Sequence, residues 1–203
     1  MKELLSSLFV LIAVIDPLGT VPVYLEATKH FDKKHKRKIA INASITAFFV
    51  LLFFIVVGQI ILEGMEITLE AFQISGGVIL FLFAYKMIFG EGKPTSEKQM
   101  IKDYKHVTVF PVAVPSIASP GAILAVVLLT DNHVFSIVHQ LITTVLIFVV
   151  IVITCLLLLA STGIQKRIGE SGILIISKIM GLILASYAAQ SILGGIKAFY
   201  FTT

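Results

Sequence analysis

Two short motifs place a polar side chain directly before a proline within long apolar segments: Asp16-Pro17 and Ser119-Pro120. A proline inside a helix removes a backbone hydrogen bond and clashes with the preceding turn, at a cost of about 3 kcal/mol or more. Proline is nevertheless well suited to the first position of a new helix, with Asp or Ser as the cap before it. We therefore predict that both apolar segments are interrupted here, and that half-helices begin at Pro17 and at Pro120.

A helix that begins in the middle of a membrane directs unpaired N–H groups and a partial positive charge into the protein. Lipid cannot bind these groups, so they must face a protein-lined cavity, where they suit a carboxylate. Asp16 is the only acidic residue deep within an apolar segment; it would bind an ammonium group, carry a proton or cap its helix. Gly19 and Gly121 leave room for a small ligand. The alternative is that both kinks only shape helix packing.

The predicted binding site combines these two breaks with polar residues of a neighbouring segment. Asn42 and Ser44 either line the same cavity or form hydrogen bonds between helices. The predicted substrate-binding residues are Asp16, Pro17, Leu18, Gly19, Thr20, Asn42, Ser44, Ser116, Ser119, Pro120 and Gly121.

Other kinds of chemistry lack the necessary residues. No histidine has the spacing to a carboxylate or another ligand that would make a metal site. The sequence has no Gly-x-Ser-x-Gly elbow and no phosphate-binding loop, and a single cysteine, Cys155, cannot form an internal disulfide. We predict neither an enzyme nor a resident cofactor, and leave open whether a proton or a sodium ion couples to the function.

The elements that must position the site are membrane helices. Of the 203 residues, 57% are hydrophobic and 14% are charged, against about 45–50% and about 25% in soluble domains. Six apolar segments are each long enough to cross a hydrocarbon core of about 30 Å as a helix. The sequence therefore predicts an all-α membrane protein that forms a single transmembrane domain over residues 1–203. The predicted spans are residues 4–27, 38–62, 69–89, 107–129, 136–161 and 173–198.

The basic residues predict how the helices are inserted. Fourteen of the sixteen Lys and Arg residues lie at the first, third and fifth connections, the exceptions being Lys2 and Lys197. Cytoplasmic loops collect Lys and Arg, so we expect a multi-pass protein of the cell (inner or plasma) membrane with both termini outside. The basic connections also suit anionic lipid headgroups. Because topology explains the net charge of +4, we predict no nucleic-acid partner.

An internal repeat is also indicated. Residues 77–90 align without gaps against residues 181–194, with six of fourteen positions identical, including both flanking glycines. The Asp-Pro and Ser-Pro breaks occupy the first helix of each predicted half. Three helices per half require that the halves, about 1–92 and about 104–203, enter the membrane in opposite orientations. Paired interruptions in inverted repeats are typical of transporter binding sites.

Several motifs resemble those of the MarC family of bacterial and archaeal inner-membrane proteins. Residues 16–22 fit its Asp-Pro-hydrophobic-Gly-x-x-Pro pattern, and residues 75–81 and 180–184 also look like family features. Residues 115–121 resemble the family's fourth-helix pattern, with Ser119 where glycine is usual. The resemblance covers essentially the whole chain. It implies six helices in two inverted repeats, and transport of small neutral amino acids such as glycine and alanine, as described for some members.

Taken together, the pattern and the resemblance predict a secondary transporter of small neutral amino acids that works by alternating access. Its substrate would bind at mid-membrane between the half-helices of the first and fourth spans. Two alternatives remain open at the level of sequence: a passive channel or exporter for another small solute or cation, and a non-transporting membrane scaffold. The coupling ion, the direction of transport and the oligomeric state are also open.

Overall fold

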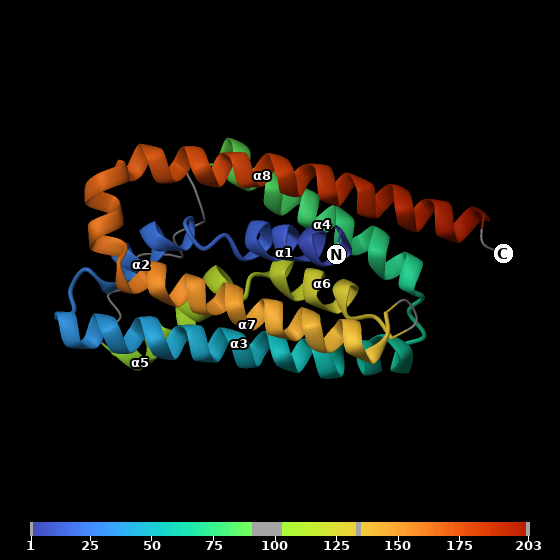
Figure 1. Ribbon diagram of the computed structural model, residues 1–203, viewed down its shortest axis with the longest axis horizontal. Helices are drawn as coiled ribbons and strands as arrows, with labels where there is room; N and C mark the ends of the chain where they lie inside the picture. Colours follow the sequence, from blue (N-terminus) through green and yellow to red (C-terminus); the bar gives the residue numbers. More distant parts are fainter. Residues whose placement is uncertain (1, 91–102, 133–134, 202–203) are drawn as a thin grey trace.

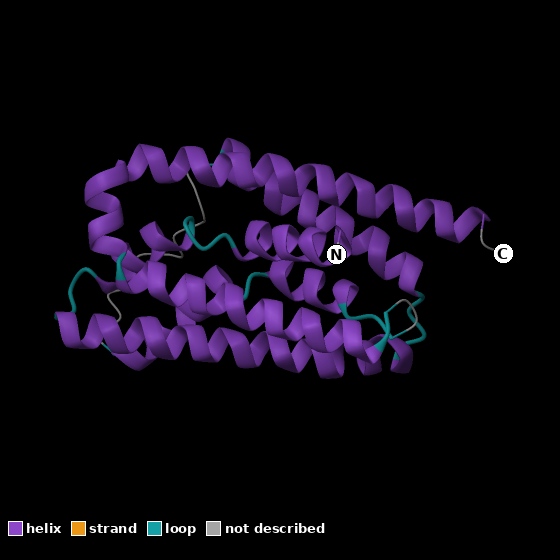
Figure 2. Ribbon diagram, in the orientation of Figure 1, coloured by secondary structure: helices purple, strands orange, loops and turns teal. Residues whose placement is uncertain are grey.

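The computed structural model describes residues 2–90, 103–132 and 135–201, and in these ranges the chain forms helices joined by short loops, without strands (Figure 2). The elements in chain order are α1 (Lys2–Ile15), α2 (Thr20–Thr28), α3 (Lys33–Gly64), α4 (Leu69–Phe89), α5 (Tyr104–Val107), η1 (Thr108–Ile117), α6 (Pro120–Leu129), α7 (Ile137–Leu159) and α8 (Ser161–Phe201). Gly169, with φ of 73°, divides α8 into a short first part and a long second part. The predicted all-α class is confirmed.

The helices pack in three groups (Figure 1). α4 and the long part of α8 pack along each other on one side, and α3 packs with α7 on the opposite side. α1 and α6 lie between these pairs. α1 contacts α6, and α2 contacts η1, so the two interrupted segments run side by side. The buried core includes Leu11, Val14, Ala43, Ile117 and Leu184.

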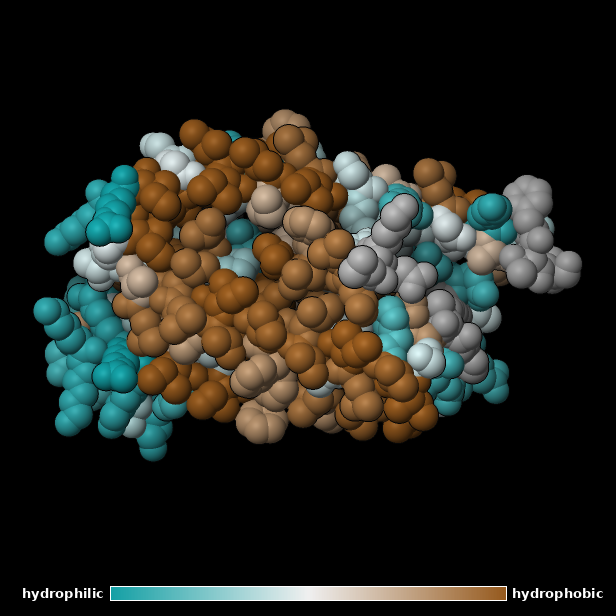
Figure 3. Space-filling view, viewed as in Figure 1, coloured by the Kyte–Doolittle hydropathy of each residue, from teal (hydrophilic) through white to brown (hydrophobic). Residues whose placement is uncertain are grey.

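The surface of this bundle is suited to lipid. Among the described residues, five helical stretches are long and apolar enough to cross a membrane, or six if the bent segment from Tyr104 to Leu129 is one span. Large apolar side chains point outward; Phe49 is 61% exposed and Val145 60%. A broad apolar surface lies between two hydrophilic ends (Figure 3). The protein is therefore a multi-pass membrane protein.

Two predicted spans are longer in the structure than the sequence indicated. Lys33–Gly64 includes basic residues of the predicted first connection, and Ser161–Phe201 includes residues of the predicted fifth connection. The early start of α3 has a local cause: Asp32, in extended conformation, accepts the N–H of His35 at 2.9 Å and caps the helix. Lys93, Lys98 and Lys102, which belong to the third connection, lie outside the described residues.

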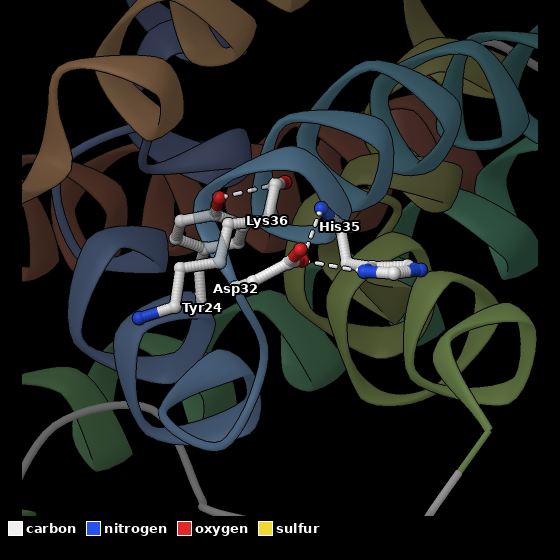
Figure 4. Close-up of polar contacts among 4 residues, drawn as sticks. All are labelled: Tyr24, Asp32, His35 and Lys36. Carbon is white, nitrogen blue, oxygen red and sulfur yellow. Dashed lines mark hydrogen bonds and ion pairs between the residues drawn. The ribbon is translucent and has the colours of Figure 1, made fainter.

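Polar contacts hold the connection between α2 and α3 (Figure 4). The Tyr24 hydroxyl donates to the Lys36 carbonyl at 2.9 Å, which ties α2 to the first turn of α3. The side chain of Asp32 also contacts the ring of His35. The backbone N–H of His35, and after it the His35 ring, hold the pKa of Asp32 below its usual value. The helix cap formed by Asp32 and the hydrogen bond from Tyr24 thus stabilise the connection.

Small residues bring α4 and α8 close together, and their contacts are reciprocal. A Cβ atom on Gly77 would lie 2.6 Å from Ile192 Cγ1 and 3.1 Å from the Ala188 carbonyl oxygen. A Cβ atom on Gly181 would lie 3.1 Å from Ile88 Cγ1 and 3.3 Å from the carbonyl oxygen of the alanine at position 84. In the alignment of residues 77–90 with 181–194, position 77 corresponds to 181, 84 to 188 and 88 to 192. Each glycine therefore packs on the counterparts of the residues that surround the other.

Replacing Gly77 by alanine is expected to destabilise the protein by about 1–3 kcal/mol, because the new methyl group overpacks the α4–α8 contact. Gly163→Ala is the matched control, since nothing lies within 4 Å of its added Cβ and alanine favours a helix more than glycine. Unfolding of the purified protein in mixed micelles measures both. Equal stability of Gly77→Ala and the wild type would contradict the close packing.

Candidate functional site

The first helix break lies between α1 and α2 and is built around Asp16. Asp16 has φ of 45°, a left-handed conformation that Asp and Asn adopt more readily than most residues. Its side chain accepts the N–H of Gly19 at 3.0 Å, and its carbonyl accepts both the N–H and the hydroxyl of Thr20 at 3.1 Å. The N–H groups of Gly19 and Thr20 therefore both bind Asp16, the first through its carboxylate and the second through its backbone carbonyl.

The predicted start of the first half-helix at Pro17 is wrong, because α2 begins at Thr20. Pro17, Leu18 and Gly19 form a turn instead. The reason is local: the left-handed Asp16 reverses the chain, and its carboxylate then closes the turn on Gly19.

The second break lies between η1 and α6. η1 contains two extended residues, Phe110 and Val114, each of which precedes a proline, a position where helical geometry is disfavoured. Ser119 caps α6 by accepting the N–H of Ala122 at 3.1 Å, with Pro120 in the first turn. α6 begins at Pro120, the residue at which the sequence predicts a helix start. The two helical pieces on either side of the break are bent by 56°.

The two breaks meet inside the protein. The Ser119 hydroxyl donates to the Val14 carbonyl at 3.2 Å, across 105 positions of sequence. In the opposite direction, the Thr20 hydroxyl lies 3.5 Å from the Ser116 carbonyl oxygen, which is a longer contact. The C-terminal turn of α1 thus faces the N-terminus of α6, which places opposite ends of two helix dipoles together. One small region contains two helix N-termini, a carboxylate and several hydroxyl groups.

These polar groups are enclosed. Asp16 is 1% exposed and Ser119 0%, and apolar core residues such as Val14, Ile15 and Ile117 surround them. Burial of a carboxylate is costly unless dipoles and hydrogen bonds compensate, and the N-terminus of α2 supplies both. The polar groups at the two breaks are therefore closed to solvent in this arrangement of the helices.

One residue of the site was missed by sequence reasoning. Ser177, in the long part of α8, is 6% exposed, and its hydroxyl lies 2.7 Å from the position of a Cβ atom built on Gly19. The same position is 1.9 Å from Asp16 Oδ2. α8 therefore brings a hydroxyl to the first break. Only tertiary packing reveals this, since a single serine in an apolar helix carries no signal in the sequence.

Four other predicted residues have different surroundings. Asn42 is exposed on α3, and the Ser44 hydroxyl donates to the Ala40 carbonyl of its own helix at 2.9 Å. Pro120 is exposed. A Cβ atom on Gly121 would lie 3.1 Å from Leu80 Cδ2 of α4, so the small size of this glycine serves helix packing. The structure thus brings together Asp16, Gly19, Thr20, Ser116 and Ser119, and adds Ser177.

The side chains at this site can form hydrogen bonds and interact with charged groups. In the described part of the chain, no group of three or more His, Cys, Asp or Glu side chains is placed to hold a metal ion. A carboxylate and hydroxyl oxygens can accept hydrogen bonds from a cationic group, and Ser119 and the start of α6 can donate to an anionic one. The arrangement suits a small zwitterion.

Substitution of Ser119 by alanine is expected to cost about 1–2 kcal/mol of stability, because it removes the cap of α6 and the donor to the Val14 carbonyl. Thr68→Ala, which removes the exposed cap of α4, is the control and should cost less. Urea or detergent unfolding followed by circular dichroism measures both. A Ser119 variant as stable as the wild type would mean that the two breaks are not joined through this hydroxyl.

Comparison with known proteins shows similarity to one protein family over almost the whole chain. Residues 1–200 match the family described as "MarC family integral membrane protein". The chain is 34% identical over 203 residues to a UPF0056 membrane protein of Buchnera aphidicola, covering 98% of this chain and 99% of that one. It is 33% identical to the UPF0056 inner membrane protein YhgN of Escherichia coli, covering 97% and 98%. A UPF0056 membrane protein of Methanocaldococcus jannaschii is 32% identical, covering 95% and 93%. No solved structure matches the chain.

Proposed function

Because the chain belongs to the MarC family of integral membrane proteins, we propose that it is a secondary transporter of small neutral amino acids such as glycine or alanine. The observation that carries this proposal is the hydrogen bond from Ser119 to Val14, which joins the two buried helix breaks beside the Asp16 carboxylate. An ionisable residue inside a membrane is costly and marks a functional site by default. Broken helices at membrane depth are tolerated only where protein surrounds them.

The substrate would bind as a zwitterion between the two breaks. Its ammonium group binds the Asp16 carboxylate. Its carboxylate takes the Ser119 hydroxyl in exchange for the Val14 carbonyl, and lies at the positive N-terminus of α6. Because the two breaks are in direct contact, only a small side chain fits between them. This favours glycine and alanine over larger amino acids.

Access to the site from each side would alternate by rocking of one group of helices against another. Two observations support this. The α4–α8 pair packs more extensively within itself than on the rest of the protein. The reciprocal contacts of Gly77 and Gly181 are those expected of two halves related by an internal two-fold axis, as in inverted repeats. We therefore take α1–α4 and α5–α8 as the two halves, with α1–α2 and η1–α6 as the discontinuous helices.

Uptake of radiolabelled glycine and alanine into proteoliposomes tests the proposal. A transporter gives saturable uptake and counterflow, in which unlabelled substrate inside drives labelled substrate inward. Flux that does not saturate and shows no counterflow would indicate a channel. Absence of flux for all small amino acids, with protein that is folded and inserted, would leave a scaffold role.

We also propose that both termini lie outside the cell and that the connection between α2 and α3 faces the cytoplasm. In a Cys155→Ser background, Met65→Cys should react with a membrane-impermeant maleimide in intact cells, whereas Lys34→Cys should react only after permeabilisation. Both positions are exposed in the structure, so the difference reports the side of the membrane. The reverse labelling pattern would invert the assigned orientation, which rests on the basic connections.

A further inference from the structure

The hydroxyl of Ser177 is buried and makes no hydrogen bond to any described residue. Other hydroxyls in these helices donate to the carbonyl four residues earlier, as Ser44 does in α3, Thr154 in α7 and Ser186 in α8. Ser177 forgoes this local bond although it lies within a long helix. A buried hydroxyl without a partner is destabilising, which makes Ser177 a candidate for a functional role.

The hydroxyl of Ser177 lies close to the Asp16 carboxylate, and this position indicates what its role is. A Cβ atom on Gly19 would lie 1.9 Å from Asp16 Oδ2 and 2.7 Å from Ser177 Oγ. The two oxygens can therefore be no farther apart than the sum of these distances, which is within reach of one small bridging group. Asp16 Oδ1 accepts the N–H of Gly19, and Oδ2 lies on the same side of Gly19 as the Ser177 hydroxyl. A carboxylate oxygen and a hydroxyl oxygen together favour a ligand that only donates or is positively charged.

We propose that Asp16 and Ser177 together bind a small monovalent cationic group at the first helix break, between α1 and α2. This inference rests on the proposed transport function and names the half of the site that takes the positive charge. Two sources share this chemistry: the primary ammonium group of the substrate and an alkali cation such as Na⁺. Ser177 contributes a second oxygen ligand to the group that Asp16 attracts by its charge.

The location of Ser177 on α8 gives this contact a second consequence. α8 packs chiefly on α4, whereas Asp16 lies between α1 and α2. A cation held by both residues links the α4–α8 pair to the segment formed by α1 and α2. Rocking of the pair away from α1 and α2 would separate the two oxygens and release the cation. Binding thus favours one arrangement of the helices over the other.

Ser177→Ala in the purified full-length protein tests the inference by thermal unfolding with added methylammonium chloride, sodium chloride or choline chloride. Choline controls for ionic strength and, as a quaternary ion, cannot donate N–H bonds. The wild type should be stabilised by methylammonium, by Na⁺ or by both, beyond the effect of choline. In Ser177→Ala the half-effective concentration should rise roughly ten- to hundredfold, while the melting temperature without ligand stays equal or rises because an unpartnered hydroxyl has been removed.

Ser191→Ala is the matched control on the same helix. Its hydroxyl donates to the Gln73 carbonyl at 3.3 Å, so the substitution should lower the melting temperature and leave the half-effective concentration unchanged. A response to methylammonium alone assigns the site to the substrate ammonium, and a response to Na⁺ assigns it to an ion. Lack of any specific cation effect in the wild type, or equal cation dependence in Ser177→Ala, overturns the inference.

The two proposals can fail separately. Glycine flux by the wild type with unaltered cation dependence in Ser177→Ala would remove only the role of Ser177. Specific cation binding that depends on Ser177, in a protein that moves no amino acid, would keep this site and remove the proposed function.

Discussion

Replacement of Gly19 by alanine is expected to lower amino-acid uptake about 100-fold, the scale of effect that a displacement of about 1 Å produces in a positioned site. The added Cβ atom would lie 1.9 Å from Asp16 Oδ2 and 2.7 Å from the carboxyl carbon of that residue. No real contact is this short, so the carboxylate must shift from its position, which disturbs the bond that it accepts from the Gly19 N–H. Backbone strain does not contribute, because Gly19 has φ of −67° and ψ of −16°, which alanine adopts freely.

The measurement is initial-rate uptake into proteoliposomes at matched protein content. Gly64→Ala serves as the control, because nothing lies within 4 Å of its added Cβ, and its uptake should equal that of the wild type. Normal uptake by Gly19→Ala would show that the Asp16–Gly19 turn takes no part in transport.

Asp16→Asn is expected to lower substrate affinity about ten- to hundredfold with little loss of stability, because it removes charge and keeps geometry. Asparagine tolerates the φ of 45° at this position, and its amide oxygen can still accept the N–H of Gly19. The loss of a hydrogen bond to a charged group is worth about 1.5–3 kcal/mol, which corresponds to the expected change in affinity.

Asp16→Ala separates the role in transport from the role in the fold. Alanine lacks the acceptor for Gly19 and is disfavoured in the left-handed region, so this variant should be destabilised by about 1–3 kcal/mol. Thermal unfolding and the Michaelis constant for uptake are measured for both variants. The interpretation fails if Asp16→Asn transports normally, since the carboxylate would then be a helix cap and nothing more.

The spans themselves were predictable because each depends on local composition. α4 has the predicted bounds, Leu69–Phe89, where an apolar run follows a threonine that caps the helix. The start of α6 was predictable for a similar reason, since Ser119 and Pro120 are a cap and a first-turn residue that need no distant partner.

The start of α2 was not predictable from the same rule. That proline fits the first turn of a helix does not show that Asp16, the residue before Pro17, adopts a left-handed conformation. Asp16 turns the chain with a positive φ, and its carboxylate then binds Gly19, which delays the helix by three residues. The placement of Asn42 could have been found from periodicity. Ala43, Ala47 and Leu51 are buried along one face of α3, and Asn42 lies off that stripe.

No sequence pattern revealed which distant segments contact each other at the site. The Ser119–Val14 bond joins residues 105 positions apart, and Ser177 reaches the first break from the last helix. Apolar helices of similar composition pack in many ways, so only the tertiary arrangement identifies which serine meets which break. The same arrangement assigns Gly121 to the contact with Leu80 and not to the ligand.

Isothermal titration of the purified protein with a panel of amino acids tests most directly whether the two breaks form one binding site. We predict saturable binding of glycine and alanine with one site per chain, weaker or no binding of amino acids with large side chains, and loss of binding in Gly19→Ala with Gly64→Ala unaffected. Binding that is absent for every small amino acid, or that persists unchanged in folded Gly19→Ala, would contradict a solute site at these breaks.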